Sequence, residues 1–383
     1  MRVFVFAHSA GWGGAERSLL FTLNGLVQRG FEIQVAVPRE GPWIEQAKQC
    51  GIESIVFPHK WWAAAERSGV PGLARVAMNQ LRLRAATKLV QQFFPHVIYS
   101  NTVVIPMGAM TAQKLGLPHV WHLREYGFAD HGLRFALGWK RAAQWMRRSG
   151  SLYVTNSRAL GTYYQKWLPI DDVHVATQGL DITGLQNLSQ STLPVGQRYF
   201  VSAGSLVPGK GHELAIHGFS HIAHDYQEVA LRIVGTGPTR YASHLRDIVD
   251  RLGLSERVSF AGYRDDLPGI LRGAHAVIVA SSSEAFGRVT AESMILGTPV
   301  IGAASGGTVE LLEDGAGYLF QERDPVSLAT RLVEVLEDDA RYQSVVKKAT
   351  LRSQDLFSGD KYIGRMQEIL NKASLLGKNV DDE

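Results

Sequence analysis

The segment from Ser283 to Met294 carries two glutamates eight positions apart, Glu284 and Glu292. A helix that begins near Gly287 would leave Glu284 in the preceding loop and set Glu292 one to two turns inside the helix. Carboxylates accept hydrogen bonds from hydroxyl groups, so the pair is suited to holding a sugar at two places. The alternative for each glutamate alone is helix capping or a solvated surface position.

A lysine stands near the end of a glycine-rich turn that runs from Gly204 to Gly211. Backbone N–H groups and the positive end of a helix dipole bind anions, and Lys210 would add a full charge, so this turn is suited to a diphosphate. The turn Gly235-Thr-Gly237 ends the next predicted strand and offers further backbone donors. The alternative for Lys210 is an exposed lysine in an ordinary turn.

Another glycine-rich turn, Gly11-Trp-Gly13-Gly14-Ala-Glu16, opens a helical pattern after the first apolar run. Its N–H groups could hold phosphate in the same way. A dinucleotide fingerprint would place a third glycine at position 16, where the chain has glutamate, so the sequence does not support a nicotinamide cofactor. A tight strand-to-helix turn is the alternative interpretation.

Two groups of residues are of metal-ligand type without the context of a metal site. Asp265 and Asp266 follow Gly262-Tyr-Arg264 in a loop, and we expect them to cap the next helix. Three histidines are spaced to share one helix face, which could bind zinc, but no supporting ligand accompanies them and we expect a solvated or packing face. They are His217, His221 and His224. The sequence predicts neither a metal nor a cofactor.

The elements that position these residues follow from short apolar runs that alternate with amphipathic stretches, the pattern of βαβ units. The first half predicts six strands, at 3–7, 33–37, 54–57, 97–101, 119–122 and 151–155, with helices near 15–29, 73–94, 105–115 and 133–148. The polar stretch from Thr183 to Gln197 shows neither period and predicts a linker. We therefore expect an N-terminal Rossmann-like domain over residues 1–184.

The second half repeats the alternation, with strands predicted at 199–203, 230–234, 258–260, 276–279 and 299–302 and helices after Asp324. We expect a second Rossmann-like domain over residues 198–355 and a C-terminal helical segment over 356–383 that packs back on the first domain. The fold class is α/β with two doubly wound parallel sheets. Ligands of such sheets bind outside the carboxyl ends of the strands, so we expect the site in a cleft that both sheets face.

Length and charge limit the class of protein. A chain of 383 residues favours two domains, and its single cysteine, Cys50, permits neither an internal disulfide nor a thiolate zinc cluster, which fits a reducing cytoplasm. The first apolar run is too short for a secretory signal, and no run approaches the ~18–20 residues that cross a bilayer.

Charge is divided unevenly along the chain. Residues 1–150 carry 18 basic and 8 acidic side chains, and the remainder carries 22 and 28. The basic first part indicates an anionic partner, with membrane phospholipid, a phosphorylated lipid and nucleic acid all compatible. Its mixture of aromatic and cationic residues suits a membrane surface, and a merely solvated basic face is the alternative. The residues concerned are Trp61, Trp62, Arg75, Arg82, Arg84, Lys88, Trp139, Lys140, Arg141, Trp145, Arg147 and Arg148.

In order and spacing, these motifs resemble those of the retaining glycosyltransferases of family 4, over nearly the whole chain. Residues 13–16 resemble the family's N-terminal glycine loop, residues 204–211 its G-x-L-x-x-x-K-G turn and residues 284–292 its E-x7-E motif. Gly306-Gly307 follows where the family has a further glycine pair. The resemblance implies the GT-B fold, in which two Rossmann-like domains face a central cleft.

The resemblance also implies roles for the matching residues. Lys210 would contact the donor diphosphate, Glu292 the ribose hydroxyls and Glu284 the hydroxyls of the donor sugar. His122, at the end of the fifth predicted strand, resembles the family's active-site histidine, and an ordinary strand-end histidine is the alternative. The further residues expected at the nucleotide-sugar are Gly13, Gly14, Ser205, Gly237, Arg264, Phe286, Gly287 and Arg288.

Two positions depart from the family pattern. Ser205 stands where the family often has an arginine, so one diphosphate cation is missing there, and Arg288 or Arg124 is a candidate substitute. Gln178 stands where the family has asparagine at the junction between the domains, a milder change.

The resulting hypothesis is a retaining, metal-independent enzyme that moves a hexose from a UDP- or GDP-linked donor to a glycan or lipid-linked acceptor in bacterial cell-surface glycan synthesis, at the inner face of the membrane. Breaking the glycosyl–phosphate bond builds charge on the diphosphate, which Lys210 and helix N-termini would stabilise. The departing phosphate would itself deprotonate the acceptor. The alternatives are a nucleotide-sugar epimerase or inactive relative, and a nucleic-acid-binding protein, for which the chain shows no recognition module.

Overall fold

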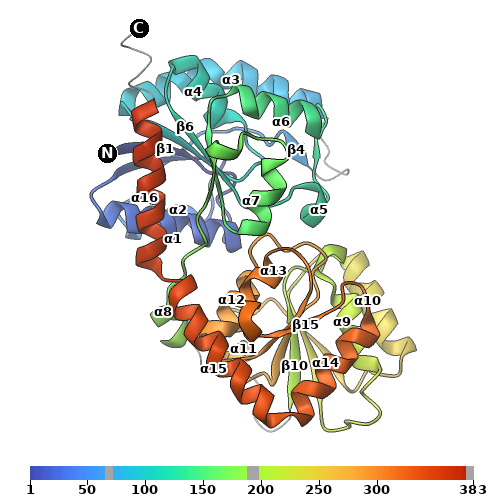
Figure 1. The fold of residues 1–383 in the computed structure, drawn as a ribbon. Helices are drawn as coiled ribbons and strands as arrows, with labels where there is room; N and C mark the ends of the chain where they lie inside the picture. The colour runs from blue at the N-terminus through green and yellow to red at the C-terminus, as the bar shows by residue number, and fades with distance from the viewer. Residues whose placement is uncertain (65–71, 188–197, 377–383) are drawn as a thin grey trace. The chain divides into compact units, whose positions relative to one another are not determined.

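The computed structural model describes residues 1–64, 72–187 and 198–376. Contacts within the chain divide it into two compact units (Figure 1). Unit 1 comprises Met1–Leu180 together with the chain from Gly359 onward, and unit 2 comprises Asp181–Ser358. Each unit is built on a parallel sheet of its own, which confirms the predicted α/β class.

Unit 1 contains a seven-stranded parallel sheet in the order β3-β2-β1-β5-β6-β8-β9. The strands are β1 (Arg2–Phe6), β2 (Glu32–Val37), β3 (Glu53–Val56), β5 (Val97–Asn101), β6 (His119–Leu123), β8 (Leu152–Thr155) and β9 (Val173–Val175). A short antiparallel ribbon joins β4 (Ala63–Ala64) to β7 (Arg134–Phe135). Because helices cover both faces of such a sheet, its central strands are buried on both faces, and Phe4, Val5 and Phe6 of β1 are fully buried.

Along the chain, the helices of unit 1 connect these strands or follow the last of them (Figure 1). They are α1 (Gly14–Gln28), α2 (Pro42–Gln49), α3 (Gly72–Phe93), α4 (Met107–Leu115), α5 (Phe128–His131), α6 (Trp139–Arg148), α7 (Arg158–Gln165), the 3-10 turn η1 (Ile170–Asp172) and α16 (Gly359–Leu376).

The C-terminal helix α16 packs against α1, so the end of the chain completes unit 1 (Figure 1). A Cβ atom on Gly25 of α1 would come within 2.6 Å of Ile363 Cγ1, so the close approach of the two helices requires glycine at that position. The hydroxyl groups of Thr22 and Tyr362 lie 2.7 Å apart and hydrogen-bond across the same contact.

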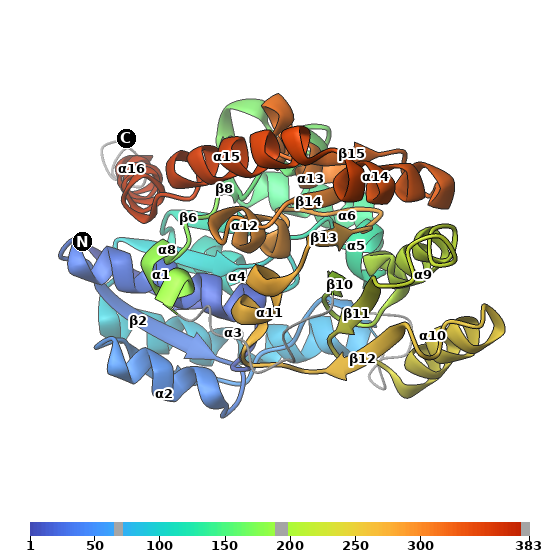
Figure 2. The same ribbon diagram turned by 90° about the horizontal axis from the view of Figure 1, so that it is seen from below.

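Unit 2 contains a six-stranded parallel sheet in the order β12-β11-β10-β13-β14-β15. The strands are β10 (Tyr199–Ala203), β11 (Ala230–Val234), β12 (Val258–Gly262), β13 (Ala276–Val279), β14 (Val300–Ala303) and β15 (Tyr318–Phe320). The helices are α8 (Ile182–Asn187), η2 (Pro208–Lys210), α9 (His212–Ser220), α10 (Thr239–Arg251), α11 (Leu267–Gly273), α12 (Arg288–Ile295), α13 (Gly306–Leu311), η3 (Glu313–Gly315), α14 (Pro325–Glu337) and α15 (Asp339–Leu356). Figure 2 shows α9 and α10 beside β11 and β12.

The structure differs from the sequence-based expectation in a few short elements. The edge strands β9 and β15 were not predicted, because three residues are too few to show a period. Helix α8 occupies the beginning of the predicted linker, whose residues 188–197 lie outside the described part of the chain. Helix α6 begins only after Gly138, whose φ of 78° interrupts the predicted helix from 133. Among the described residues, no helix is long and apolar enough to cross a membrane.

Candidate functional site

The glycine-rich turn after β10 brings Lys210 to Glu284. Lys210 Nζ lies 2.9 Å from Glu284 Oε2 and 3.2 Å from Oε1, and the two side chains are 27% and 14% exposed. Gly211 ends the turn at a φ of 71°, where a Cβ atom would come within 2.0 Å of the Ala280 carbonyl oxygen. The turn therefore packs directly on the end of β13, and this contact sets the lysine against the glutamate.

The glycine pair at the start of α13 fixes the backbone of Glu284. The Gly307 N–H donates to the Glu284 carbonyl at 2.6 Å. A Cβ atom on Gly306 would come within 2.5 Å of the same carbonyl oxygen, so only glycine allows this approach. Gly287, at a φ of 89°, lets the chain turn from Glu284 into α12.

The second glutamate of the motif lies in α12 and is paired within its own helix. Arg288 Nε donates to Glu292 Oε1 at 2.6 Å, and the Glu292 carboxylate is 8% exposed. Phe286 is buried and packs edge-on against Phe357 at 5.9 Å between ring centroids. Glu284 therefore lies in the loop and Glu292 in the second turn of the helix, as the sequence predicts.

Two neighbouring loops pack on the lysine turn at the same edge of the sheet. A Cβ atom on Gly235 would come within 1.8 Å of the Gly204 carbonyl oxygen, and one on Gly237 within 2.1 Å of the Leu206 carbonyl oxygen. The Ser205 side chain is exposed, and its carbonyl accepts a hydrogen bond from His212 at 3.2 Å. The turns after β10 and β11, the Glu284 loop and the start of α12 thus form one continuous candidate site in unit 2.

Arg264 follows β12 and pairs with Asp266, the N-cap residue of α11. Arg264 Nε donates to Asp266 Oδ1 at 2.8 Å and its Nη2 to Oδ2 at 2.7 Å. Asp266 occupies the N-cap position of α11, as expected, but its side chain makes no capping hydrogen bond there. The carboxylate instead binds the arginine.

The three histidines that could share a helix face do not lie on one helix. Helix α9 ends at Ser220, so only His217 lies within it, while His221 is its C-cap and His224 follows. No group of three candidate metal ligands gathers among residues 1–64, 72–187 and 198–376.

In unit 1, the glycine turn after β1 holds Glu16, which lies beside His8, a residue that the sequence analysis did not single out. Gly13 N–H donates to Glu16 Oε2 at 3.2 Å, and Gly14 begins α1. His8 Nε2 lies 3.4 Å from Glu16 Oε1. Burial raises the pKa of Glu16, but the hydrogen bond and the charge of His8 outweigh it and lower the pKa to about 2. The carboxylate is therefore ionised, and it accepts the hydrogen bond from the Gly13 N–H that stabilises the turn.

Arg124, which follows β6, is the centre of a buried network in unit 1. It is 8% exposed and donates from Nε to Asn101 Oδ1 at 2.6 Å and from Nη1 to Gln178 Oε1 at 2.6 Å. The amide of Asn101 lies 3.3 Å from His8 Nδ1, and the Tyr362 hydroxyl donates to Gln178 Oε1 at 3.3 Å. The network ties β1, β5, β6 and α16 together.

His122 belongs to this network and is fully buried in β6. Its Nδ1 lies 3.3 Å from Arg124 Nη2 and within hydrogen-bond distance of the Tyr99 hydroxyl. A guanidinium only donates, so Nδ1 is the acceptor and Nε2 carries the proton, and Nε2 has no partner among the described residues. Burial and then the Arg124 charge lower the pKa of His122 well below its usual value, so the ring is neutral.

Glu125, which directly follows Arg124, is a second buried carboxyl that the sequence analysis did not single out. Its Oε1 accepts from the Val103 N–H at 2.8 Å. Burial, and then the charge of Asp130, raise the pKa of Glu125 to about 8. At neutral pH it is therefore a protonated acid.

Two family models match the chain in succession. Glycosyltransferase Family 4 matches residues 12–183, and Glycosyl transferases group 1 matches residues 186–352. The two matched regions together span both units apart from the ends of the chain.

Two curated relatives match about half of this chain. The mannosylfructose-phosphate synthase of Agrobacterium fabrum is 27% identical over 214 residues, which are 52% of this chain and 46% of the relative. A D-inositol 3-phosphate glycosyltransferase of Corynebacterium efficiens is 29% identical over 178 residues, which are 45% of this chain and 42% of the relative. The matched region thus spans less than half the length of either relative.

Solved structures share the fold over almost the whole chain. HepE of Anabaena, solved with UDP and with UDP-glucose, superposes with a TM-score of 0.78 at 23% identity and covers 97% of this chain and 100% of its own. The sucrose-phosphate synthase of Thermosynechococcus elongatus has a TM-score of 0.75 at 17% identity, with 97% and 99% covered. With both family models matched in chain order and the two-sheet architecture shared along its length, the chain belongs to the group 1 glycosyltransferases of GT-B fold.

Proposed function

We propose that the protein is a retaining glycosyltransferase that moves a hexose from a nucleotide-diphosphate sugar to a hydroxyl acceptor. The observation that carries this proposal is the Lys210–Glu284 pair at 2.9 Å, held in a cradle of three glycine turns at the carboxyl edge of the unit 2 sheet. A lysine there supplies charge for a diphosphate, and a carboxylate beside it supplies an acceptor for sugar hydroxyls.

The pair would separate when the donor binds. The diphosphate would take the Lys210 ammonium group and backbone N–H groups of the glycine turns that are not engaged within the sheet, which frees the Glu284 carboxylate for the sugar. Glu292, inside α12, would accept from the ribose hydroxyls, with Arg288 exchanging its present partner for phosphate. The Phe286 and Gly287 N–H groups would complete the contacts, and Arg264 would lie near the base.

The chemistry follows from the leaving group. Cleavage of the bond between the sugar and the diphosphate develops negative charge on the leaving phosphate, and we propose that Lys210 and backbone donors would stabilise that charge without a metal. The acceptor hydroxyl would lose its proton to the same phosphate oxygen and attack from the face that the diphosphate leaves. The configuration at the anomeric carbon would then be retained.

Unit 1 would bind the acceptor. His122 lies near the carboxyl end of β6, where ligands of parallel sheets bind, and the turn at Gly13 and Gly14 after β1 would face the nucleotide-sugar. We propose a glycan or lipid-linked acceptor in cell-surface glycan synthesis, reached from the cytoplasmic side of an anionic membrane, because of the 18 basic against 8 acidic residues in positions 1–150. UDP and GDP are both candidate donor nucleotides, and HepE, which was solved with UDP-glucose, makes UDP the first to test.

The experiment is a product analysis with UDP- and GDP-linked hexoses. The purified protein is incubated with each donor, with and without a panel of polyprenyl-phosphate-linked sugars, and with a chelator. The proposal expects release of the nucleoside diphosphate that needs an acceptor and survives chelation, and a product of retained anomeric configuration by NMR.

Matched variants identify the site. Lys210→Ala is expected to weaken donor binding on the order of 10- to 100-fold, since hydrogen bonds to charged groups contribute about 1.5–3 kcal/mol. Lys347→Ala, at an exposed lysine of α15 in the same unit, is expected to leave binding unchanged. If the donor is epimerised and no sugar is transferred, the protein is an epimerase rather than a transferase. If the donor binds but no acceptor supports turnover, the protein is an inactive relative.

A further inference from the structure

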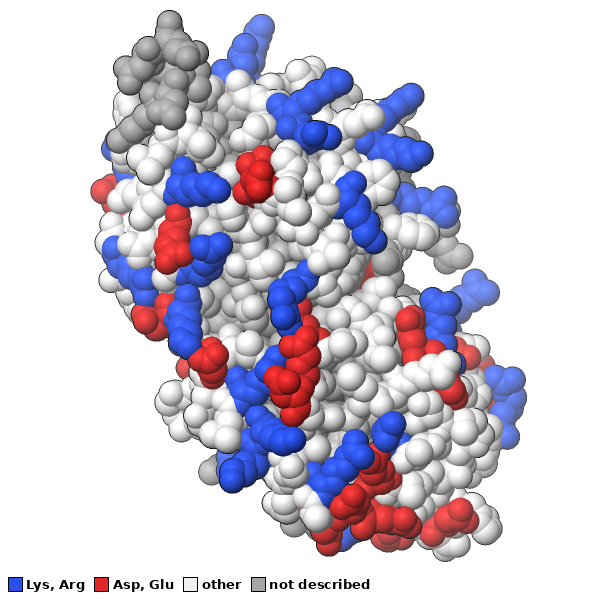
Figure 3. Space-filling view, viewed as in Figure 1, with Lys and Arg blue, Asp and Glu red and all other residues white. Residues whose placement is uncertain are grey.

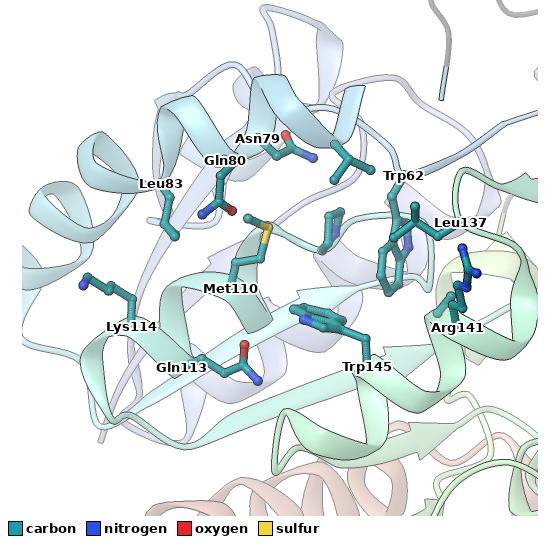
Figure 4. A pocket seen from close by; sticks show the side chains of 13 residues that line it. Trp62, Asn79, Gln80, Leu83, Met110, Gln113, Lys114, Leu137, Arg141 and Trp145 are labelled. Carbon is teal, nitrogen blue, oxygen red and sulfur yellow. The ribbon is translucent and has the colours of Figure 1, made fainter. Parts of the chain in front are cut away.

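A cavity of about 480 Å³ lies in unit 1 among α3, α4 and α6, and none of the expected site residues lines it. This volume falls in the range of about 300–1,000 Å³ that small-ligand pockets occupy. Figure 4 shows Trp62, Met110 and Trp145 pointing into it from the loop before β4, from α4 and from α6. Val76, Leu83 and Ala142 complete an apolar lining.

The aromatic wall of the cavity is rigid. The Trp62 and Trp145 rings meet edge to face at 5.1 Å between centroids, and Trp121 lies behind them at 6.2 Å from Trp145. Trp62 donates its indole N–H to the Val103 carbonyl at 2.8 Å. Because this indole N–H is already bonded, Trp62 presents an apolar surface to the cavity, which suits a hydrocarbon rather than a polar ligand.

Cations border the same cavity. Lys114 of α4 and Arg141 of α6 are exposed, line its two ends in Figure 4, and have no ion pair or hydrogen bond within the described part of the chain. A ligand that fits this arrangement has an apolar chain and an anionic end.

The surface around the cavity carries one sign of charge. The three helices α3, α4 and α6 contain no aspartate or glutamate. Figure 3 shows lysine and arginine side chains along the edge of unit 1 where α3 and α6 lie. The exposed cations of the three helices are Arg84, Lys88, Lys114, Lys140, Arg141, Arg147 and Arg148. Such a surface attracts the anionic headgroups of a phospholipid leaflet.

We propose that this face docks on an anionic phospholipid membrane and that the cavity takes up one hydrocarbon chain of a lipid. This inference rests on the proposed function, because a docked membrane would bring the lipid-linked acceptor near unit 1. The evidence for docking is the cavity and the cations around it. Cationic helices alone give binding that salt abolishes. Entry of a lipid hydrocarbon chain into the cavity adds a hydrophobic contribution to the binding free energy, which salt does not remove.

The test is co-sedimentation of the full chain with vesicles of phosphatidylcholine and phosphatidylglycerol, at low and at high salt. We expect binding to vesicles that contain phosphatidylglycerol and a residual part of it at high salt. Lys114→Glu/Arg141→Glu is expected to weaken binding at least ~10-fold at low salt. The control Lys166→Glu/Lys347→Glu makes the same change in net charge at exposed lysines outside these helices and is expected to lose clearly less affinity.

Chain entry is read by fluorescence with phosphatidylglycerol brominated on its acyl chains. The brominated chain is expected to quench tryptophan emission, and Trp145→Phe is expected to remove part of that quenching while preserving the fold. Equal quenching in the wild type and Trp145→Phe, or equal binding by the two charge-reversed proteins, would overturn the proposal. Donor binding is measured separately without lipid, so a protein that binds UDP-sugar but not vesicles refutes this inference alone, and the reverse result refutes the proposed donor site alone.

Discussion

Polar side chains at the strand ends of the two units are held in different ways. In unit 1, Arg124 is 8% exposed, and its guanidinium donates to neutral acceptors on Asn101 and Gln178. In unit 2, Lys210 and Glu284 are 27% and 14% exposed and pair with each other. Releasing a buried donor from its acceptors is costly, whereas a partly exposed ion pair exchanges partners at small cost. The difference indicates a fixed scaffold in unit 1 and an exchangeable pair in unit 2.

The largest effect on stability is expected at Arg124. The substitution Arg124→Met leaves the buried Asn101 Oδ1 without its donor and leaves Gln178 Oε1 with only the Tyr362 hydroxyl, and an unsatisfied buried group costs about 1–3 kcal/mol. We expect a loss of about 3 kcal/mol in the free energy of unfolding, measured by urea denaturation. Arg147→Met, at an exposed arginine of α6, is the control and is expected to change stability by less than ~0.5 kcal/mol. Equal losses in both variants would show that the network is not a scaffold.

Glu125 is expected to make the stability of unit 1 depend on pH. Its pKa is raised to about 8, so the folded protein keeps a proton that the unfolded chain loses near 4.5. Stability from this group is therefore present at low pH and decreases as pH rises from about 4.5 to about 8. Glu125→Gln is expected to flatten that decrease in urea denaturation curves between pH 5 and pH 8. A variant whose pH dependence matches the wild type would refute the protonated state.

Glu16 is expected to show the opposite sign in the same unit. Its pKa is lowered from 4.5 to about 2, so its contribution is present above pH 4.5 and is lost as pH falls toward 2. Glu16→Gln is expected to cost about 2 kcal/mol at pH 7 and progressively less below pH 4.5. Glu32→Gln, at an exposed position at the start of β2, serves as the control. A cost for Glu16→Gln that does not change with pH would contradict the ion pair with His8.

The smallest effect on stability is expected in unit 2. Glu284→Gln removes one charge of the partly exposed pair with Lys210, and such pairs contribute about 0–1 kcal/mol. We expect a change in unfolding free energy below ~1 kcal/mol, together with a clear loss of affinity for the hexose part of a nucleotide-sugar. The second readout is the difference in Kd between the nucleotide-sugar and the nucleoside diphosphate. A stability loss as large as that of Arg124→Met would contradict the exchangeable pair.

The sequence could predict most of the unit 2 site because its parts are local. The glycines of residues 204–211 and the spacing of Glu284 and Glu292 each lie within one turn or one helix start, so their geometry follows from positive φ and helix pitch. The direct Lys210–Glu284 contact is not local. It depends on the packing of Gly211 against the end of β13, which residue types alone do not reveal.

The unit 1 network could not be predicted because its members come from distant parts of the chain. The two partners of each hydrogen bond in this network are 23 to 184 positions apart in the sequence, and only the strand order brings them together. The residues are Asn101, Arg124, Gln178 and Tyr362. Arg124 was considered as a replacement for the missing diphosphate arginine at Ser205. In the structure its donors are engaged within unit 1.

The most direct test of the exchangeable pair is a calorimetric titration of UDP and of uridine into the wild type and Lys210→Ala. If Lys210 binds the diphosphate, the substitution weakens UDP on the order of 10- to 100-fold and leaves uridine unchanged, because uridine carries no phosphate. If UDP and uridine lose affinity equally, or if neither changes, Lys210 does not contact the diphosphate, and the donor site proposed for unit 2 is contradicted.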